Sequence, residues 1–274
     1  MELNNSVNFS ILMSLYNKEA PNSLHDCLLS IQKNTLTPSE IVLVFDGKIN
    51  EELNSVVKKF SHLLPIKVIR LSKNLGLGNA LNEGLKHCIY DWVFRMDTDD
   101  LCSSNRFKKQ VNYINNHSDV TLFGSNTEEF DSSMVTSLGQ RRVPINNNEI
   151  REYIKRRNPF NHMTVAFRKD VIESVGGYQH HLYMEDYNLW IRVIAAGHQV
   201  GNIDEVLVNV RGGDSMVKRR KGLVYIKSEL QLAKLKIEKN IDSPIGAYSN
   251  FIIRSLPRLL PTYMLSKVYK KLRK

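Results

Sequence analysis

The chain has little cysteine and no long apolar run. Its 274 residues include three cysteines, Cys27, Cys88 and Cys102, which follow no Cys-x-x-Cys spacing. A disulfide framework and a cysteine-based zinc site therefore have little support, and a reducing cytoplasm is the expected compartment. The first residues, MELNNSVNFS, lack the basic start and apolar core of a secretory signal. No stretch approaches the ~20 apolar residues that span a bilayer, so neither secretion nor membrane insertion is predicted.

Acidic residues are scarce in the C-terminal part of the chain. Residues 215–274 hold 15 Lys and Arg against Glu229, Glu238 and Asp242, whereas residues 1–214 carry 23 basic and 25 acidic side chains. The formal net charge of +10 is thus a property of the C-terminal part. This asymmetry indicates an anionic partner for that part, either a membrane surface or nucleic acid.

Short β-rich runs alternate with amphipathic segments in the first half of the chain. The five candidate strands are FSILMS (9–14), EIVLVF (40–45), IKVIRL (66–71), DWVFRM (91–96) and VTLFGS (120–125). Apolar residues at helical spacing follow the first, third and fourth of them. This alternation predicts βαβ units and a mostly parallel sheet, in which a ligand binds beyond the carboxyl ends of the strands. Further helices are expected over 148–156, 186–196 and 221–239.

Three carboxylates occupy four positions where the fourth candidate strand ends, in the stretch VFRMDTDD (93–100). One carboxylate would suffice to cap a helix, and three so close together repel one another. A hard cation such as Mg²⁺ accepts several carboxylate oxygens and is often shared with substrate phosphates. Asp97, Asp99 and Asp100 therefore favour a metal site over a solvated helix start.

Polar residues also follow the first three candidate strands. Ser14, Tyr16 and Asn17 come after the first strand, and Asp46 precedes a glycine after the second. By itself an Asp-Gly pair is more typical of a turn. The stretch NLGLG (74–78) could present N–H groups to a phosphate, but it lacks the spacing of known phosphate loops, so a tight turn is favoured.

A second acid pair, Glu185-Asp186, stands at the start of a helical segment with an apolar face that includes Leu189 and Trp190. Acids at this place interact favourably with the helix dipole, which is sufficient reason for them to be there. The alternative is that one of them acts as a general base toward an acceptor hydroxyl. The residues alone leave both readings open.

Taken in order, seven segments resemble the family 2 glycosyltransferases over roughly residues 8–215: SILMSLYN, EIVLVFDG, NLGLGNALNEGL, FRMDTDD, NRFKKQ, GGY and EDYNLWIRVIAAG. The resemblance is closest to bacterial enzymes that extend O-antigen or exopolysaccharide repeat units on a lipid carrier. It implies a GT-A fold, with nucleotide-sugar binding over about 1–125 and acceptor binding with the catalytic base over about 126–214. Residues 215–274 would then be a basic helical C-terminal extension. The implied reaction is sugar transfer from a nucleoside diphosphate, usually UDP, with inversion.

On the nucleotide side, the resemblance is carried over residue by residue. The loop of Ser14, Tyr16 and Asn17 would lie against the nucleotide, and Asp46 would contact the base. Arg106 matches a basic position that recurs shortly after the acidic motif, and it is expected to bind the nucleotide-sugar.

Asp97 and Asp99 match the DxD motif of the family. The resemblance implies that Asp99 ligates Mn²⁺ or Mg²⁺ and that Asp97 holds the ribose or the metal. Asp186 matches the catalytic base, with Glu185 beside it on the acceptor side. His162 matches a recurrent histidine near the acceptor, although a hydrogen-bonded core histidine is the other reading. One base and one metal suffice for a single displacement.

The sequence departs from the family at one place. Many members carry an Arg-x-His after the base helix, and its His completes the metal site, whereas here the chain reads VRGGDSM (210–216). Water or Asp214 could take that place, or the metal could bind only with the nucleotide. Arg219 and Arg220, together with Arg211, are expected to meet the diphosphate from a loop that orders on donor binding, because guanidinium groups suit phosphate oxygens. A solvated basic run is the other reading.

The last residues, 251–274, combine seven Lys and Arg with mainly aliphatic side chains and no acid. This composition favours anionic lipid headgroups over nucleic acid, which would call for stacking aromatic residues. We expect a cytoplasmic protein that is peripheral on the inner face of the bacterial inner membrane. Its substrates would be a UDP-sugar, with glucose or galactose as the hexose, and a polyprenyl-diphosphate-linked saccharide.

Two other functions compete with this interpretation. A phosphatase with an aspartyl nucleophile would place an Asp-x-Asp motif after its first strand, whereas Asp97 follows the fourth candidate. A non-catalytic, membrane-associated scaffold with a GT-A-like fold would not need all four acids, Asp46, Asp97, Asp99 and Asp186. Both remain alternatives to a glycosyltransferase.

Overall fold

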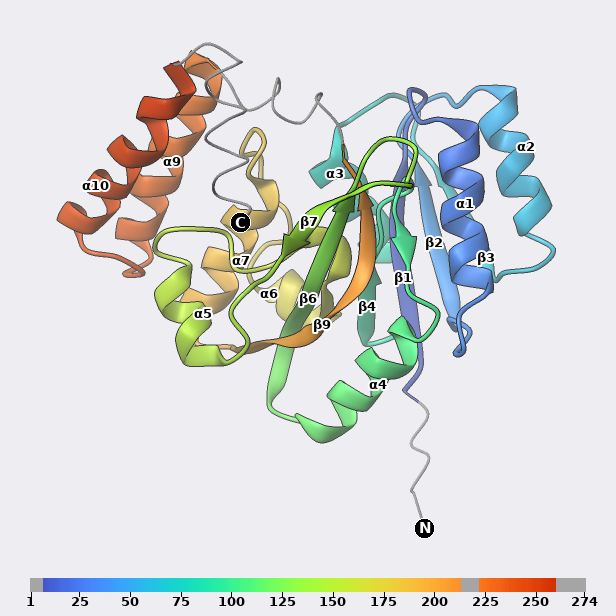
Figure 1. Ribbon diagram of the computed structural model, residues 1–274, viewed down its shortest axis with the longest axis horizontal. Coiled ribbons are helices and arrows are strands. Elements are labelled where there is room, and N and C mark those ends of the chain that lie inside the picture. The colour runs from blue at the N-terminus through green and yellow to red at the C-terminus, as the bar shows by residue number, and fades with distance from the viewer. Residues whose placement is uncertain (1–6, 213–221, 260–274) are drawn as a thin grey trace.

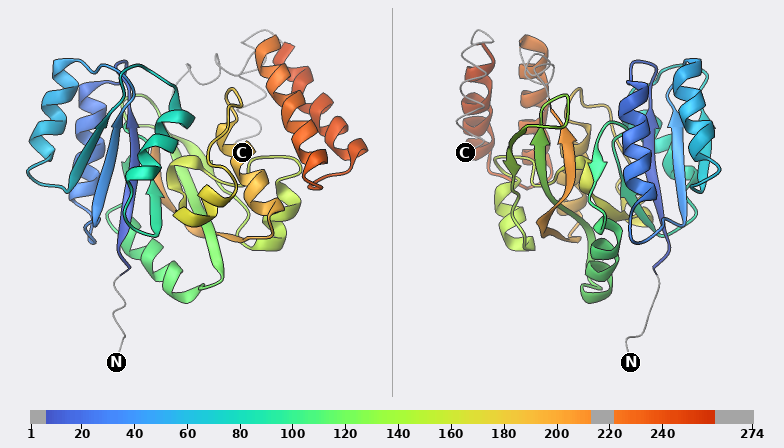
Figure 2. Two further views of the ribbon diagram at one scale, coloured as in Figure 1. Left: turned by 180° about the vertical axis from the view of Figure 1, so that it is seen from behind. Right: turned by 45° about the vertical axis from the view of Figure 1, so that its right-hand side comes forward.

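A computed structural model describes residues 7–212 and 222–259 of the chain. These residues form a nine-stranded sheet in the order β3-β2-β1-β4-β8-β6-β9-β5, with β7 paired to β6. Helices cover both faces of the sheet (Figures 1 and 2). The predicted α/β class is confirmed.

The first half of the chain alternates strands and helices. Its elements are β1 (Phe9–Leu15), α1 (Pro21–Gln32), β2 (Glu40–Phe45), α2 (Glu51–Phe60), β3 (Ile66–Arg70), α3 (Leu77–His87), β4 (Trp92–Arg95), β5 (Leu101–Cys102) and α4 (Arg106–Asn116). The second half contains β6 (Val120–Phe130), β7 (Ser137–Arg141), α5 (Asn147–Tyr153), η1 (His162–Thr164), β8 (Ala166–Arg168), α6 (Lys169–Ser174), α7 (Glu185–Ala195) and β9 (Gln199–Arg211). The C-terminal elements are α9 (Leu223–Glu238), α10 (Pro244–Ser255) and η2 (Leu256–Leu259).

Strands β3, β2, β1 and β4 pair in parallel. Because strand side chains alternate between faces, Ile11 and Leu43 pack toward α1 and α2, whereas Leu12 and Val44 pack toward α3. Helix α3 lies so close that a Cβ added to Gly84 would stand 2.5 Å from Leu12 Cδ1. The parallel strands β1 and β2 are therefore buried on both faces, and the loops after the parallel strands meet at one edge.

The fifth predicted strand, β6, does not continue the parallel pairing that the alternation of strands and helices suggested. β6 does not pair with the parallel set directly, because β8 lies between β4 and β6 and is antiparallel to both. β8 has three residues, too few to show a strand period. β6 instead forms its longest pairing with β9, in parallel.

The C-terminal helices are attached to the rest of the fold by buried contacts. Tyr225 and Leu232 of α9 belong to the same buried cluster as the apolar face of α7. Arg254 of α10 donates two hydrogen bonds of 2.8 Å to Glu229 of α9, whose side chain is 2% exposed. Within residues 7–212 and 222–259, no helix is both long enough and apolar enough to cross a bilayer.

Candidate active site

Arg95 and Asp97 form a buried ion pair where β4 ends. They are two residues apart, so both side chains point to the α3 side of the sheet. Arg95 is 1% exposed, and its Nη2 donates to Asp97 Oδ1. Burial alone would raise the pKa of Asp97, but the Arg95 guanidinium, with smaller contributions from His162 and Arg106, holds that pKa below its usual value. Asp97 is therefore fixed as a carboxylate.

Asp99 and Asp100 have different environments from Asp97. Burial raises the pKa of Asp99 to about 7, and the neighbouring charges of Asp97 and Glu19 add to the effect. Asp100 accepts a 2.9 Å hydrogen bond from the main-chain N–H of Arg211, and Arg211 Nε donates to the carbonyl of Asp99 at 3.1 Å. The end of β9 thus fixes the acidic loop, and Asp99 carries charge that burial disfavours.

Asp97 and Asp99 fit a divalent cation shared with a diphosphate. A cation would compensate the carboxylate repulsion that raises the pKa of Asp99. Within 7–212 and 222–259, no cluster of three or more His, Cys, Asp or Glu side chains could hold a metal ion. Two carboxylates plus phosphate oxygens are the ligand set that Mg²⁺ usually takes, so a closed protein cage is not needed.

Asp186 lies in the first turn of α7, facing the loop that precedes η1. Asn158 Nδ2 donates a 2.7 Å hydrogen bond to Asp186 Oδ2. Next to this pair, His162 Nε2 lies 2.8 Å from the hydroxyl of Tyr178. Burial, followed by the positive charge of Arg95, lowers the pKa of His162 to about 4. The histidine is therefore neutral near pH 7.

The start of α7 and the end of β4 meet around His162. Its protonation responds to the charges of Arg95, Asp186 and Asp97 together, and so does that of Tyr178. The fold therefore brings the acidic motif and the expected base into one electrostatic cluster with His162. The resemblance placed His162 near the acceptor; the structure gives it a hydrogen-bonded position within this cluster.

The Gly-rich stretch 74–78, which leads into α3, supports the site through hydrogen bonds. The N–H groups of Leu75 and Gly76 donate to the Asp46 carboxylate at 2.7 and 3.1 Å. Asn82 of α3 pairs with both main-chain polar groups of Tyr178, at 2.7 and 2.8 Å. Because those two N–H groups are already bonded, the turn interpretation fits this stretch better than a phosphate loop.

The other residues expected on the nucleotide side lie near the end of β1 and in the loops after β1 and β2. Tyr16 is exposed and Ser14 is partly buried. Asn17 Oδ1 accepts the main-chain N–H of Asn50 at 2.7 Å, which joins the two loops. Asp46 is buried with its carboxylate bonded to the turn before α3, so a contact between Asp46 and the base stays a prediction.

Arg106 does not occupy the position expected for a nucleotide-binding residue. It is 0% exposed, and its guanidinium donates to the carbonyls of Arg95 and Met163 at 2.6 and 3.0 Å and to Gln110 at 3.0 Å. These bonds use the donor groups that a phosphate would need. Arg106 therefore holds β4 and η1 together. Arg219, Arg220 and Asp214 lie outside the described residues, whereas Arg211 binds the acidic loop.

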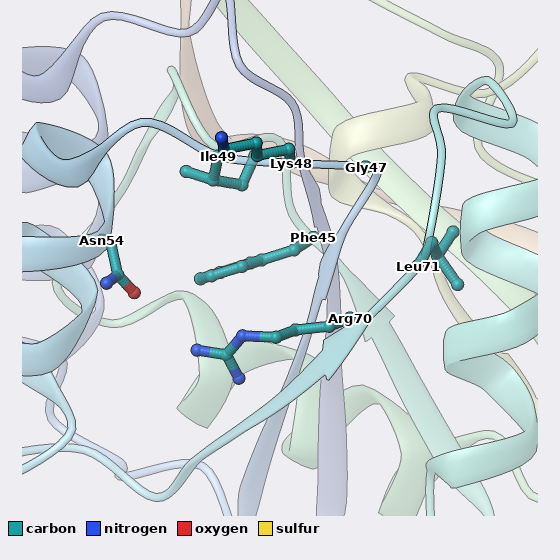
Figure 3. A pocket seen from close by; sticks show the side chains of 7 residues that line it. All are labelled: Phe45, Gly47, Lys48, Ile49, Asn54, Arg70 and Leu71. Carbon is teal, nitrogen blue, oxygen red and sulfur yellow. The ribbon is translucent and has the colours of Figure 1, made fainter.

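A cavity of about 210 Å³ opens beside the Asp46-Gly47 turn, between β2, β3 and α2. In Figure 3 the ring of Phe45 lies between Ile49 and Arg70, and the Arg70 guanidinium carbon stands 5.0 Å from the ring centroid. The residues that line the cavity include none of Asp97, Asp99 and Asp186, so the cavity is not part of the acidic cluster.

Three residues of the site received no role in the sequence-based interpretation: Arg95, Asn158 and Tyr178. Strand alternation could have indicated that Arg95 shares a face with Asp97. Asn158 and Asp186 are 28 positions apart, and Asn82 and Tyr178 are 96 apart. No local pattern predicts such pairs.

A parallel α/β unit with carboxylates at its strand ends, joined to a unit that supplies another acid at a helix start, is the arrangement of GT-A glycosyltransferases. The chain belongs to the glycosyl transferase family 2, whose model matches residues 10–176. It is therefore a glycosyltransferase.

Relatives of known name match almost the whole chain. The amylovoran biosynthesis glycosyltransferase AmsE of Erwinia amylovora is 48% identical over 266 residues, covering 97% of this chain and 99% of AmsE. The UDP-Gal:alpha-D-GlcNAc-diphosphoundecaprenol beta-1,3-galactosyltransferase of Escherichia coli is 41% identical over 263 residues, covering 96% of this chain and 95% of that enzyme. Among solved structures, S. aureus TarS 1–349 in complex with UDP-GlcNAc aligns with a TM-score of 0.68 at 18% identity, over 90% of this chain and 72% of TarS. That similarity confirms the fold.

Proposed function

We propose that this glycosyltransferase moves a hexose from a UDP-sugar to a polyprenyl-diphosphate-linked saccharide in bacterial O-antigen or exopolysaccharide synthesis. The proposal rests on the meeting of β4, which ends in the Arg95–Asp97 pair, with η1 and with α7, which begins at Glu185-Asp186. Arg106 bridges the carbonyls of Arg95 and Met163, and the His162 ring lies 6.2 Å from that of Trp190 in α7. Galactose is the first candidate and glucose the second, because a relative 41% identical along nearly its whole length is named as a galactosyltransferase that uses UDP-Gal.

The proposed reaction is a single displacement with inversion. Asp186 takes the proton from the acceptor hydroxyl as its oxygen attacks the anomeric carbon, and UDP leaves from the opposite side. Asn158 orients the Asp186 carboxylate for this task. Arg95 keeps Asp97 ionised and in place beside Asp99. A Mn²⁺ or Mg²⁺ ion held by Asp99 and Asp97 would stabilise the charge that develops on the leaving diphosphate.

The donor and acceptor can be tested directly with the full-length protein. Release of the nucleoside diphosphate, UDP or GDP, is measured for a panel of UDP-sugars and GDP-sugars, with and without Mn²⁺, in the presence of an N-acetylglucosamine diphospho-lipid. We expect UDP-galactose or UDP-glucose to give release that depends on both the metal and the acceptor. Release only from a GDP-sugar, or no transfer to any lipid-linked saccharide, would contradict the proposal.

Peripheral attachment to the inner membrane face is part of the same proposal. Residues 251–274 carry seven basic and no acidic side chains, which suits anionic lipid headgroups. Helix α10 and η2 also expose large apolar side chains at helical spacing: Ile245, Tyr248, Ile252 and Leu256. An interfacial helix combines such an apolar stripe with neighbouring positive charge. We therefore place α10 and the following residues against the bilayer that holds the lipid carrier.

A further inference from the structure

Tyr183 is an exposed aromatic residue three positions before the base Asp186. Its side chain is 46% exposed, and its φ of 67° lies in the left-handed region that residues other than glycine rarely adopt. The residue sits in the loop that joins α6 to α7, which lies beside α9 in both views of the fold (Figures 1 and 2). An unfavourable backbone conformation therefore displays a tyrosine next to the catalytic acid pair.

The ring of Tyr183 is held in a fixed orientation. It stacks on Tyr225 of α9, with ring centroids 5.8 Å apart and planes 21° apart. On Tyr225, which is buried, the Arg258 guanidinium lies 4.6 Å from the ring centroid. A stack supported in this way by buried groups orders Tyr183 while almost half of its surface stays open to solvent.

The loop that carries Tyr183 is also fixed on both sides. Toward the start of the loop, both main-chain polar groups of Tyr178 are hydrogen-bonded to the side chain of Asn82 in α3. In its middle, His181 is buried, its Nε2 lies 2.8 Å from the Ser228 carbonyl, and its Nδ1 lies 3.1 Å from Asn188 Nδ2. A carbonyl only accepts, so Nε2 donates to Ser228 and Nδ1 accepts from Asn188. The position of Tyr183 relative to Asp186 is thus set by the fold.

We propose that the open face of Tyr183 is a platform for a sugar ring of the acceptor saccharide. One face of a pyranose presents C–H groups that carry partial positive charge, which complements the negative face of an aromatic ring. Tyr183 and Asp186 are three positions apart, so their Cα atoms are separated by at most ~10 Å. One or two sugar rings span such a distance. The reacting hydroxyl must lie at Asp186, so its own sugar or the next one along the chain meets Tyr183.

The acceptor fits this platform better than the donor does. The residues expected to hold the nucleotide, Tyr16, Asn17 and Asp46, lie in the loops after β1 and β2, and Figure 1 shows these two strands on the opposite side of the molecule from α9. Tyr183 lies on the α9 side of the base. The inference rests on the proposed function, because it assumes that the acceptor is a saccharide.

Three variants distinguish the effect of the aromatic ring from the effect of the backbone conformation at position 183. Tyr183→Gly removes the ring and suits the left-handed conformation, so it should fold without added strain. Tyr183→Phe keeps the ring and removes only the hydroxyl. Tyr183→Leu keeps apolar bulk without an aromatic face. For each variant, the acceptor KM, the donor KM, kcat and the acceptor-independent hydrolysis of the UDP-sugar are measured with an N-acetylglucosamine diphospho-lipid as acceptor.

We expect Tyr183→Gly and Tyr183→Leu to raise the acceptor KM about threefold to tenfold, with donor KM and donor hydrolysis unchanged. Tyr183→Phe should stay within about twofold of the wild type, since the ring is retained. An unchanged acceptor KM in Tyr183→Gly, or equal losses in Tyr183→Phe and Tyr183→Gly, would overturn the platform. A donor KM that rises along with the acceptor KM would also overturn it, because the loss would then be general.

A binding measurement tests the platform independently of the proposed reaction. Saturation-transfer NMR with a short-chain N-acetylglucosamine diphospho-lipid reports which sugar protons contact the protein. We expect transfer to the C–H face of the sugar in the wild type and in Tyr183→Phe, and its loss in Tyr183→Gly. The same signal in wild type and Tyr183→Gly would contradict the platform. Absence of catalytic transfer by the wild type, with this binding pattern intact, would instead contradict the proposed function.

Discussion

Arg95 forms an ion pair with Asp97, two residues further along the chain where β4 ends, and no other hydrogen bond of its guanidinium is formed within the described part of the chain. The pair gives the two acids of the motif different properties. Asp97 is held as a carboxylate, whereas Asp99 has a pKa of about 7 because it is buried beside other acids. The positive charge that sets this difference is that of Arg95, which belongs to β4 itself.

Replacement of Arg95 should impair both the acidic motif and the fold. Arg95→Met leaves Asp97 without its partner, which we expect to lower the free energy of unfolding by about 1–3 kcal/mol and to reduce kcat more than tenfold. Arg95→Lys should recover part of the activity, because it restores the charge. Arg168→Met, which breaks an exposed ion pair between an arginine and an aspartate that are also two residues apart, is the matched control and should change neither quantity. Calorimetry of Mn²⁺ and UDP binding provides a readout beyond activity; equal affinity in Arg95→Met and wild type would contradict the role of the pair.

Asp99 should destabilise the metal-free protein at neutral and higher pH. Its folded pKa of about 7 lies above that of an unfolded aspartate, so the folded chain binds more protons between about pH 4 and 7. The contribution of this group to stability therefore falls as the pH rises through that window. At about pH 8 and without divalent cations, Asp99→Asn should melt about 2–4 °C higher than the wild type. The difference should shrink as the pH falls and vanish below about pH 3, where the carboxyl is protonated in both states.

The same variant tests the cation. Added Mn²⁺ should raise the melting temperature of the wild type at about pH 8 and leave that of Asp99→Asn unchanged. The effect in the wild type should weaken below about pH 7, since protons then compete for Asp99. Equal stabilisation of both proteins by Mn²⁺ would show that Asp99 is not a ligand.

Asn158 should act through the orientation of Asp186. Asn158→Ala removes the 2.7 Å hydrogen bond to the carboxylate, and we expect kcat to fall about tenfold while the donor KM stays the same. Steady-state kinetics with saturating acceptor checks this expectation. Asn116→Ala, at the exposed C-terminal end of α4, serves as the control. A change in donor KM with constant kcat would assign Asn158 to donor binding instead.

The buried pair of Glu229 and Arg254 should hold α10 on α9. Arg254→Ala leaves the Glu229 carboxylate, which is 2% exposed, without its partner, and this should cost about 3–5 kcal/mol in urea unfolding. The double variant Glu229→Leu and Arg254→Leu should regain most of that loss, because an apolar pair of similar size avoids the unpaired charge. A double variant as unstable as the single one would mean that other contacts of Arg254 dominate.

The exposed stripe of α10 should contribute to membrane binding separately from the basic residues. Ile252→Glu with Leu256→Glu should weaken binding to phosphatidylglycerol vesicles about tenfold or more, because each apolar side chain contributes roughly 1.5–3 kcal/mol when buried. This loss should persist at high salt, which screens only the electrostatic part. Val135→Glu, between β6 and β7, also changes an exposed apolar residue and should bind normally. Vesicle sedimentation at two salt concentrations distinguishes these outcomes.

Local patterns predicted several of the periodic elements, although α2, with Leu53, Val57 and Phe60 buried at helical spacing, and the 13-residue strand β9 were missed. The apolar residues Leu24, Cys27, Leu28 and Ile31 are buried on α1 as their helical spacing indicated. The four parallel strands lie close to their predicted ranges. β8 and β5 were not predicted, because two or three residues cannot establish a period. The acidic motif was recognised as a candidate site because three acidic residues in four positions repel one another, and this spacing can be read from the sequence.

What the sequence could not supply were contacts between distant residues. Arg106 shows this most clearly, since the family resemblance predicted that it binds the nucleotide-sugar, whereas the fold buries it against the carbonyls of Arg95 and Met163. The roles of Asn158 and Tyr183 likewise depend on where η1 and α9 pack. Such placements follow from the assembly of the sheet and not from any local pattern.

Inverting transfer with Asp186 as the base is tested most simply by comparing the wild type with Asp186→Asn, with the anomeric configuration of the product determined by NMR. We predict that the wild type transfers a hexose from a UDP-sugar to the lipid-linked saccharide with inversion. Asp186→Asn should bind the UDP-sugar with unchanged affinity and lose about 10²–10⁴-fold in kcat. Full activity in Asp186→Asn, or a product that retains the anomeric configuration of the donor, would contradict inverting transfer with Asp186 as the base.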